Sequence, residues 1–333
     1  MPGPQPTRVH ESAEILSQIC KNLDIKHVFR VARAVNMEAI NILENVNNIT
    51  MSTRNEEGLV DLPRQREENG AVNLETFMLD MAIGQSTTVQ LIRGVIEASK
   101  KTLQCLSLSF AYERFGGILN LKNLHFNSLK KIRLQNSNQI LVLDRLQHLE
   151  EVSLVKCNLG KIPFVLNSSS LRIVRVIRCD LRGILKFSIV ANRMELLQIE
   201  IGIDDVHVLH SCEMQLEISG MLDTFLYSGC ILKNNLSFNG IRMVHLSIIA
   251  DALPLTSFER DLYSFIGSLK SSITMRMDLE TSQILSKSLG HKGPLHFLDM
   301  QELHVSNCPP EIQQFLIGFL RDGYIFNIAL HQA

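Results

Sequence analysis

The chain has 333 residues, of which 45% are hydrophobic and 20% charged, and a formal net charge of −1 at pH 7. This balance excludes a disordered chain and a protein that coats nucleic acid, and no stretch approaches the roughly 18 apolar residues of a membrane span. Residues 1–10 are proline-rich and lack the apolar core of a signal peptide, so we expect a disordered start and a cytoplasmic or nuclear protein. Seven scattered cysteines without a Cys-x-x-Cys pair indicate reduced thiols.

Residues 11–45 predict a small helical module. The apolar residues of its first helix share one face: Ile15, Leu16, Ile19, Cys20 and Leu23. Asp24 is placed to cap a second helix that runs to Val35, and residues 37–43 suit one or two further helical turns. Three short helices bury too little apolar surface for a stable core, so this module is expected to complete its core against a partner.

The opening of this module resembles the F-box, which docks a substrate receptor onto the Skp adaptor of a cullin ubiquitin ligase. The family pattern E-(I/L)-L-x-x-I-(F/C)-x-x-L is present from Glu14 to Leu23. Two positions depart from the family, because Glu11-Ser12 replaces the usual Leu-Pro and Ala39 stands where an aromatic residue is expected. The resemblance implies contact with the adaptor, or a place in the small core behind it, for Ile15, Leu16, Ile19, Leu23, Val28 and Val31.

Two other interpretations use the same residues. Leu16 and Cys20 also satisfy the L-x-x-x-C core of an elongin-binding box, although Asp24 occupies a position that should be apolar. Alternatively, residues 12–45 cap the segment from Leu74 to Ile96, which we expect to be the leading helix of a repeat domain spanning 73–333. Residues 46–72 are mostly polar and predict a linker or flexible loop.

Two segments in the middle of the chain share one pattern. Leu149–Leu159 and Leu171–Leu181 both read L-x-x-V-x-(L/V)-x-x-C-x-L and start 22 residues apart. Val152 and Leu154 alternate with polar residues, as in a half-buried strand, and Cys157 suits a buried turn. The pattern resembles the leucine-rich repeat, whose period is about 20–29 residues. The resemblance implies an α/β solenoid, with short parallel strands inside and helices or loops outside, that binds a macromolecule.

The same pattern extends in both directions. Further members start at Leu103, Leu129, Met194, Glu213, Ile241 and Met300, and a degenerate member includes Ile273 and Met275. Helical spacing predicts outer helices at 257–269, at 282–289 and after Pro309 and Pro310, followed by a last strand at 324–330.

The residues between the inward-facing positions should display a binding surface. One outward position of each strand holds Ser107, Arg133, Ser153, Arg175, Gln198, Glu217, His245 and His304. We expect a basic patch at Lys131, Arg133, Arg172 and Arg175, beside Lys130. Arginine forks suit an acidic or phosphorylated partner, whereas the plainer interpretation is an ordinary solvated strand face.

No motif indicates catalysis. The chain lacks a glycine-rich phosphate loop, H-E-x-x-H and G-x-S-x-G, so we expect no enzyme, cofactor or metal, and interpret His207 and His210 as turn residues. We therefore expect the substrate-recognition subunit of a Skp–cullin ubiquitin ligase, with an adaptor, a cullin and a protein substrate as partners and neither nucleic acid nor membrane. The alternatives are a leucine-rich repeat scaffold without a ligase link, or an elongin-linked receptor.

Overall fold

The computed structural model describes residues 48–53, 74–81, 86–110, 119–120, 126–137, 139–140, 143, 146–159, 163–181, 184–202, 212–249, 255–305, 307–320 and 327–329. The chain divides into two compact units, Met1–Gln139 (unit 1) and Ile140–Ala333 (unit 2). The F-box-like residues 11–45 lie outside the described residues. Within the described ranges, no helix is long and apolar enough to cross a membrane.

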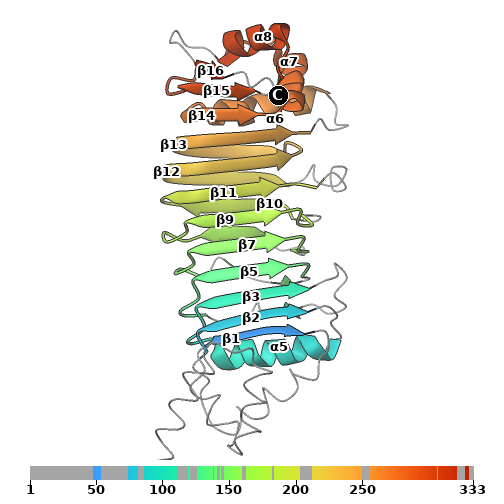
Figure 1. Cartoon of the computed structure of the whole chain (residues 1–333), viewed down its shortest axis with the longest axis vertical. Helices are drawn as coiled ribbons and strands as arrows, with labels where there is room; N and C mark the ends of the chain where they lie inside the picture. Colours follow the sequence, from blue (N-terminus) through green and yellow to red (C-terminus); the bar gives the residue numbers. More distant parts are fainter. Residues whose placement is uncertain are drawn as a thin grey trace, which may run out of the picture. The chain divides into compact units, whose positions relative to one another are not determined.

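Unit 1 is built on parallel strands (Figure 1). β1 (Asn48–Thr53), β2 (Thr76–Met81), β3 (Cys105–Phe110) and β5 (Lys131–Gln135) pair in that order. The helix α5 (Ser86–Ser99) joins β2 to β3 and contacts the short strand β4 (Leu119–Asn120). Phe77, Leu106 and Ile132 lie opposite one another in register and are fully buried, so each strand adds one layer to the same core.

Two expectations for unit 1 are wrong. Residues 48–53 fall in the expected linker but form β1, and residues 76–81 are a strand, so the expected leading helix begins only at Ser86. The reason is the period-two burial of Phe77 and Leu79, whose strand is hydrogen-bonded to a neighbour on each side. A short apolar run of this kind cannot be distinguished from the start of a helix by its hydrophobicity alone.

Unit 2 has a long parallel sheet, here called the front sheet, with its strands stacked in Figure 1. Its members, in neighbouring order, are β7 (Glu151–Val155), β9 (Ile173–Ile177), β11 (Met194–Glu200), the second parts of β12 (Glu213–Gly229) and β13 (Lys233–Ile248), β14 (Ser272–Met277), β15 (Glu302–Val305) and β16 (Asn327–Ala329).

Each strand from β7 to β15 in the front sheet contributes two buried apolar side chains at the same two positions. The two inward rows are Val152, Val174, Leu197, Phe225, Val244, Met275 and Leu303, and Leu154, Val176, Ile199, Tyr227, Leu246, Met277 and Val305, all at most 3% exposed. The strands predicted after Leu149, Leu171, Met194, Ile241 and Met300 are confirmed, and so is the strand that contains Met275.

The layer behind the front sheet changes from strands to helices along unit 2. A back sheet is formed by β8 (Phe164–Asn167), β10 (Lys186–Ala191) and the first parts of β12 and β13, residues 213–218 and 233–238. The connections after β13, β14 and β15 instead contain α6 (Leu255–Ser268), α7 (Leu279–Leu289) and α8 (Pro310–Leu320). The predicted helices are confirmed, whereas the expectation of outer helices or loops is wrong where the back sheet lies.

The expectation of a front-sheet repeat at Glu213 is also wrong. Residues 213–218 pair with β10 in the back sheet, with Leu216 opposite Ile189. The front-sheet member lies further along the same strand, where Leu222, Phe225 and Tyr227 are buried. Both halves of β12 alternate apolar and polar residues, so the pattern alone does not say which half faces front.

β12 bends at the point where it passes from the back sheet to the front sheet. The register with β13 shifts between Ile218 and Met221, and a Cβ on Gly220 would lie 2.2 Å from the carbonyl oxygen of Asn192. In the next layer, Asn239 Nδ2 donates to the carbonyl oxygen of Ser219 at 3.1 Å. The bend therefore needs a residue without a side chain, because the backbone of the preceding layer occupies the space.

We predict that Gly220→Ala destabilises the protein by about 2 kcal/mol, since the added methyl group overlaps a backbone atom that cannot move independently. Gly318 in α8 has open space within 4 Å of the point where a Cβ would stand, so Gly318→Ala should leave stability unchanged or raise it by up to about 1 kcal/mol. Urea unfolding followed by circular dichroism measures both. Equal stabilities for the two variants would contradict the crowding at Gly220.

Candidate binding face of the front sheet

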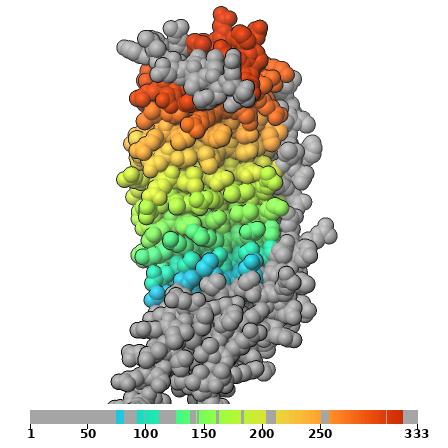
Figure 2. All heavy atoms as spheres, viewed as in Figure 1, coloured from blue at the N-terminus to red at the C-terminus, as the bar shows by residue number. Residues whose placement is uncertain are grey.

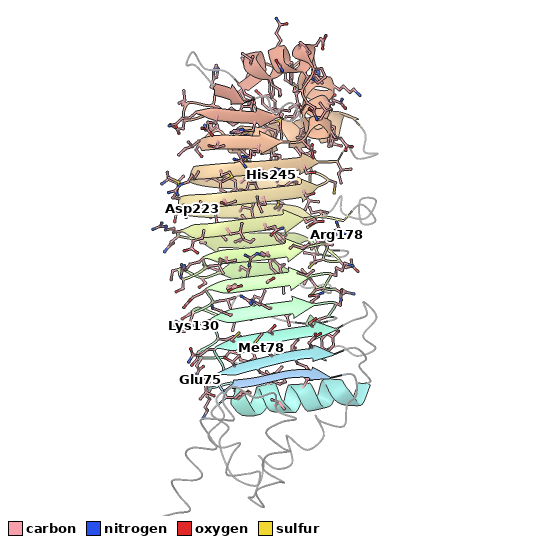
Figure 3. The ribbon with its side chains drawn as sticks, in the orientation of Figure 1. Glu75, Met78, Lys130, Arg178, Asp223 and His245 are labelled. Carbon is pink, nitrogen blue, oxygen red and sulfur yellow. The ribbon has the colours of Figure 1, made fainter. Side chains whose placement is uncertain are left out.

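The outer face of the front sheet carries one continuous row of side chains, here called the central row. Its members occupy the position between the two buried residues of each strand and lie opposite one another in register: Ser153, Arg175, Gln198, Leu226, His245, Arg276 and His304. Adjacent parallel strands are about 4.8 Å apart, which sets the spacing along the row. Figure 3 shows one member, His245, near the middle of its strand.

Aliphatic side chains flank the central row on the outer face. Half-buried members of this flanking set are Val155, Ile173, Ile177, Leu196 and Met243, and Leu226 adds aliphatic surface within the row itself. Among the described outward positions of the front sheet from β7 to β15, none holds Phe, Tyr or Trp. Figure 2 shows the strands of unit 2 as successive bands of side chains that form one face. The outer face therefore combines aliphatic and hydrogen-bonding side chains.

The four residues of the expected basic patch fall in two units. Lys131 and Arg133 are exposed on the same side of β5 in unit 1, whose outward row is Met78, Ser107 and Arg133. In unit 2, Arg175 Nη1 lies 3.6 Å from Glu151 Oε1, and Arg172 Nε donates to Glu195 Oε1 at 3.0 Å. The hydrogen bond to Glu195 raises the pKa of Arg172. Glutamates of neighbouring strands therefore balance the charges of both patch arginines that lie in unit 2, Arg172 and Arg175.

Ion pairs between neighbouring layers recur along unit 2. Arg178 Nε lies 2.5 Å from Glu200 Oε1, Arg242 Nη2 lies 3.7 Å from Asp223 Oδ1, and Lys233 pairs with Glu213 at 3.6 Å. In Figure 3, Asp223 and Arg178 lie at opposite ends of the strands, away from His245. Exposed pairs of this kind add little stability, but a shift of one residue would separate each charge from its partner.

Sequence reasoning missed two members of the central row, Leu226 and Arg276, and the charged one is Arg276. It stands in the central row on β14, between His245 and His304, its side chain is exposed, and it has no ion pair among the described residues. The signal is present in the sequence, because Met275 belongs to the degenerate repeat and the next residue of such a strand points outward. Glu217, expected in this row, lies on the back sheet instead.

The turns after the strands repeat one backbone conformation. Asn136, Lys156, Arg178 and Asn307 have φ between 49° and 52°, and each lies just beyond the end of a strand. The next residue after Lys156 and Arg178 is a buried cysteine, and Cys179 Sγ donates to the carbonyl oxygen of Leu154 at 3.4 Å. Burial raises the pKa of Cys179, and burial also raises the pKa of Cys212 to about 11. These thiols are therefore neutral packing groups rather than nucleophiles.

Metal-ligating side chains do not gather in the part of the chain that the structure describes. No group of three His, Cys, Asp or Glu residues there is arranged to hold an ion. His207 and His210 lie outside the described residues.

No known protein family model matches this chain. No curated protein matches it either.

We predict that the four buried thiols, Cys157, Cys179, Cys212 and Cys230, resist Ellman's reagent in the folded protein at pH 8. A variant with Cys20, Cys105 and Cys308 changed to serine retains these four alone. It should show no rapid reaction in buffer and four thiol equivalents in urea, because the reagent attacks only an accessible thiolate. Rapid reaction of the folded variant would contradict the packing described above.

We also predict that Arg175 stabilises the fold. The Glu151 side chain is only 8% exposed, so Arg175→Gln should lower the free energy of unfolding by about 1 kcal/mol by removing a partner of a buried carboxylate. Glu151→Gln in the same chain should restore most of the loss. Arg276→Gln is the matched control, with an expected change below about 0.5 kcal/mol. Urea unfolding measures the stabilities. An equal loss of stability in Arg175→Gln and Arg276→Gln would contradict this role.

Proposed function

We propose that this chain is a non-catalytic recognition subunit that binds a protein target on the outer face of the front sheet and belongs to a Skp–cullin ubiquitin ligase. The observation that carries the binding part is the central row, in which seven strands present their outward side chains in register beside half-buried aliphatic residues. The backbone of this face is already fixed by the hydrogen bonds of the sheet, so binding a partner costs little backbone conformational entropy.

We further propose that both units are pieces of a leucine-rich repeat solenoid. Three observations support this interpretation: all the pairings described within each unit are parallel, the buried positions recur once per layer, and a left-handed turn residue follows strands in both units. Stacked repeats of this kind bury their apolar edges against one another, and only the terminal repeats need a separate cover.

The ligase link rests on the F-box-like residues from Glu14 to Leu23. In this proposal, Ile15, Leu16, Ile19, Leu23, Val28 and Val31 contact the Skp adaptor or form the small core behind it. The front sheet then holds a protein target near the ubiquitin-transferring partner, in the cytoplasm or nucleus.

Affinity purification of the tagged full chain tests the link. We expect recovery of a Skp adaptor and a cullin with the full chain, and their loss from the variant Leu16→Glu and from a chain lacking residues 11–45. Arg276→Glu serves as the control, because it changes an exposed side chain of unit 2 and should leave adaptor recovery intact. Recovery of elongin subunits without a Skp adaptor would overturn the F-box assignment in favour of the elongin-linked receptor.

A scaffold without a ligase link is the second candidate, and one observation favours it. β1 pairs with β2 over residues 48–53, so the segment before residue 71 supplies a strand to unit 1. A deletion that separates the two candidates therefore has to stop before Asn48. If removal of residues 1–45 unfolds the rest of the chain, these residues act as a cap, whereas a stable truncated chain that no longer recovers the adaptor supports the ligase.

A further inference from the structure

The central row ends in an arginine that lies between two histidines. His245 on β13 lies opposite Arg276 on β14, and Arg276 lies opposite His304 on β15. Neighbouring strands are about 4.8 Å apart, so the three groups span about 10 Å. His245 and Arg276 are exposed, and the His304 side chain retains 19% of its exposure.

Arg276 and the other arginine of the central row differ in their acidic neighbours. Arg175 has Glu151 at 3.6 Å, while Arg276 has no acidic partner among the described residues. Glu302 lies beside His304, with its Oε2 3.1 Å from His304 Nε2, and therefore orients that ring. Asp278 follows β14, and its Oδ1 accepts from the backbone N–H of Thr281, which caps α7. The guanidinium of Arg276 is thus left for a ligand.

We propose that Arg276, with His245 beside it, binds a carboxylate or phosphate group on an extended segment of a protein partner. The inference rests on the part of the proposed function that assigns binding to this face, and does not depend on the ligase link. The planar fork of Arg276 pairs with either group through two parallel hydrogen bonds, and the imidazole of His245 adds a donor beside it. His304, whose Nε2 is held by Glu302, borders the site on the other side. An exposed arginine alone would bind any acidic segment. The aliphatic side chains of the face also contact the rest of the segment, and they therefore select among acidic segments.

The spacing of the central row specifies the segment further. Leu226 lies two strands from Arg276 along the row, a separation of about 9.6 Å. A polyproline II segment rises about 3.1 Å per residue with three residues per turn, so residues three apart point the same way about 9.3 Å apart. A β-strand would point residues three apart in opposite directions. The matching segment therefore carries an acidic residue and an aliphatic residue three positions apart.

A peptide fits this face better than a nucleic acid. Single-stranded nucleic acids are held by aromatic side chains on which the bases stack, and the described outward positions of the front sheet from β7 to β15 include no Phe, Tyr or Trp. Leu226 and Met243 instead offer half-buried aliphatic surface beside the charged end.

Fluorescence anisotropy with the full-length protein tests the inference. The probe is a fluorescein-labelled peptide of three Leu-Pro-Pro-Glu-Pro-Pro repeats, compared with peptides that have glutamine or phosphoserine in place of glutamate. We expect the glutamate or phosphoserine peptide to bind at least about tenfold more tightly than the glutamine peptide. Tighter binding of the phosphoserine form identifies phosphate as the preferred group, and tighter binding of the glutamate form identifies carboxylate.

Matched charge reversals locate the site. Arg276→Glu should weaken binding of the acidic peptide by about tenfold or more, and Leu226→Gln should weaken it severalfold. Arg260→Glu is the control, because Arg260 is an exposed arginine on α6 and the change alters net charge equally. Circular dichroism checks that all three variants remain folded.

Three results would overturn the inference: dissociation constants weaker than about 1 mM for every peptide, equal losses from Arg276→Glu and Arg260→Glu, or preferential binding of a ten-residue oligothymidine. Failure here is distinguishable from failure of the ligase proposal. Adaptor recovery depends on residues 11–45 and peptide binding on Arg276, so either result can stand without the other.

Discussion

The register of the parallel strands is the constraint on which the rest of unit 2 depends. Each layer places its two buried residues directly over those of the previous layer, from Val152 and Leu154 to Leu303 and Val305. A slip of one residue would turn both into solvent, at a cost of roughly 1.5–3 kcal/mol for each side chain. The outward residues are therefore aligned as a consequence of core packing. An outer face that is aligned by the core needs no further interactions to organise it.

The change from back sheet to helices is accommodated by the size of the buried side chains. β7, β9 and β11 bury only aliphatic residues in the two inward rows, whereas β12 buries Phe225 and Tyr227. The ring of Tyr227 lies 4.7 Å from that of Phe265 on α6, so aromatic groups fill the space where a helix replaces a strand. Asn234 Nδ2 donates to the carbonyl oxygen of Asp261 at 3.0 Å and thereby links the last strand of the back sheet to α6. An edge strand that is tied to a helix in this way is less open to pairing with another chain.

The local pattern of the sequence predicts most of the front sheet but not the layer behind it. Leu149, Val152 and Leu154 specify a strand, and the equivalent residues of β9, β11, β13 and β15 are found where the pattern places them. The back sheet escaped prediction because Leu216 and Phe225 belong to one continuous strand, and both halves alternate in the same way. Only the bend at Gly220 distinguishes them, and it depends on Asn192 of the preceding layer. A contact between layers is not contained in the spacing of either segment.

The same reasoning explains why the candidate site was only partly predictable. Position in a repeat tells which side chains point outward, and Arg175, His245 and His304 are correctly placed by it. It does not tell which charges are already matched, since Glu151 and Glu195 reach the arginines from neighbouring layers. Only the stacked layers show which charges are paired with a neighbouring layer and which charge has no partner among the described residues. On that criterion the arginine of the central row whose charge is unmatched among the described residues is Arg276, at the C-terminal end of the row rather than nearest the strongest repeats, and this is why we place the proposed anion site there.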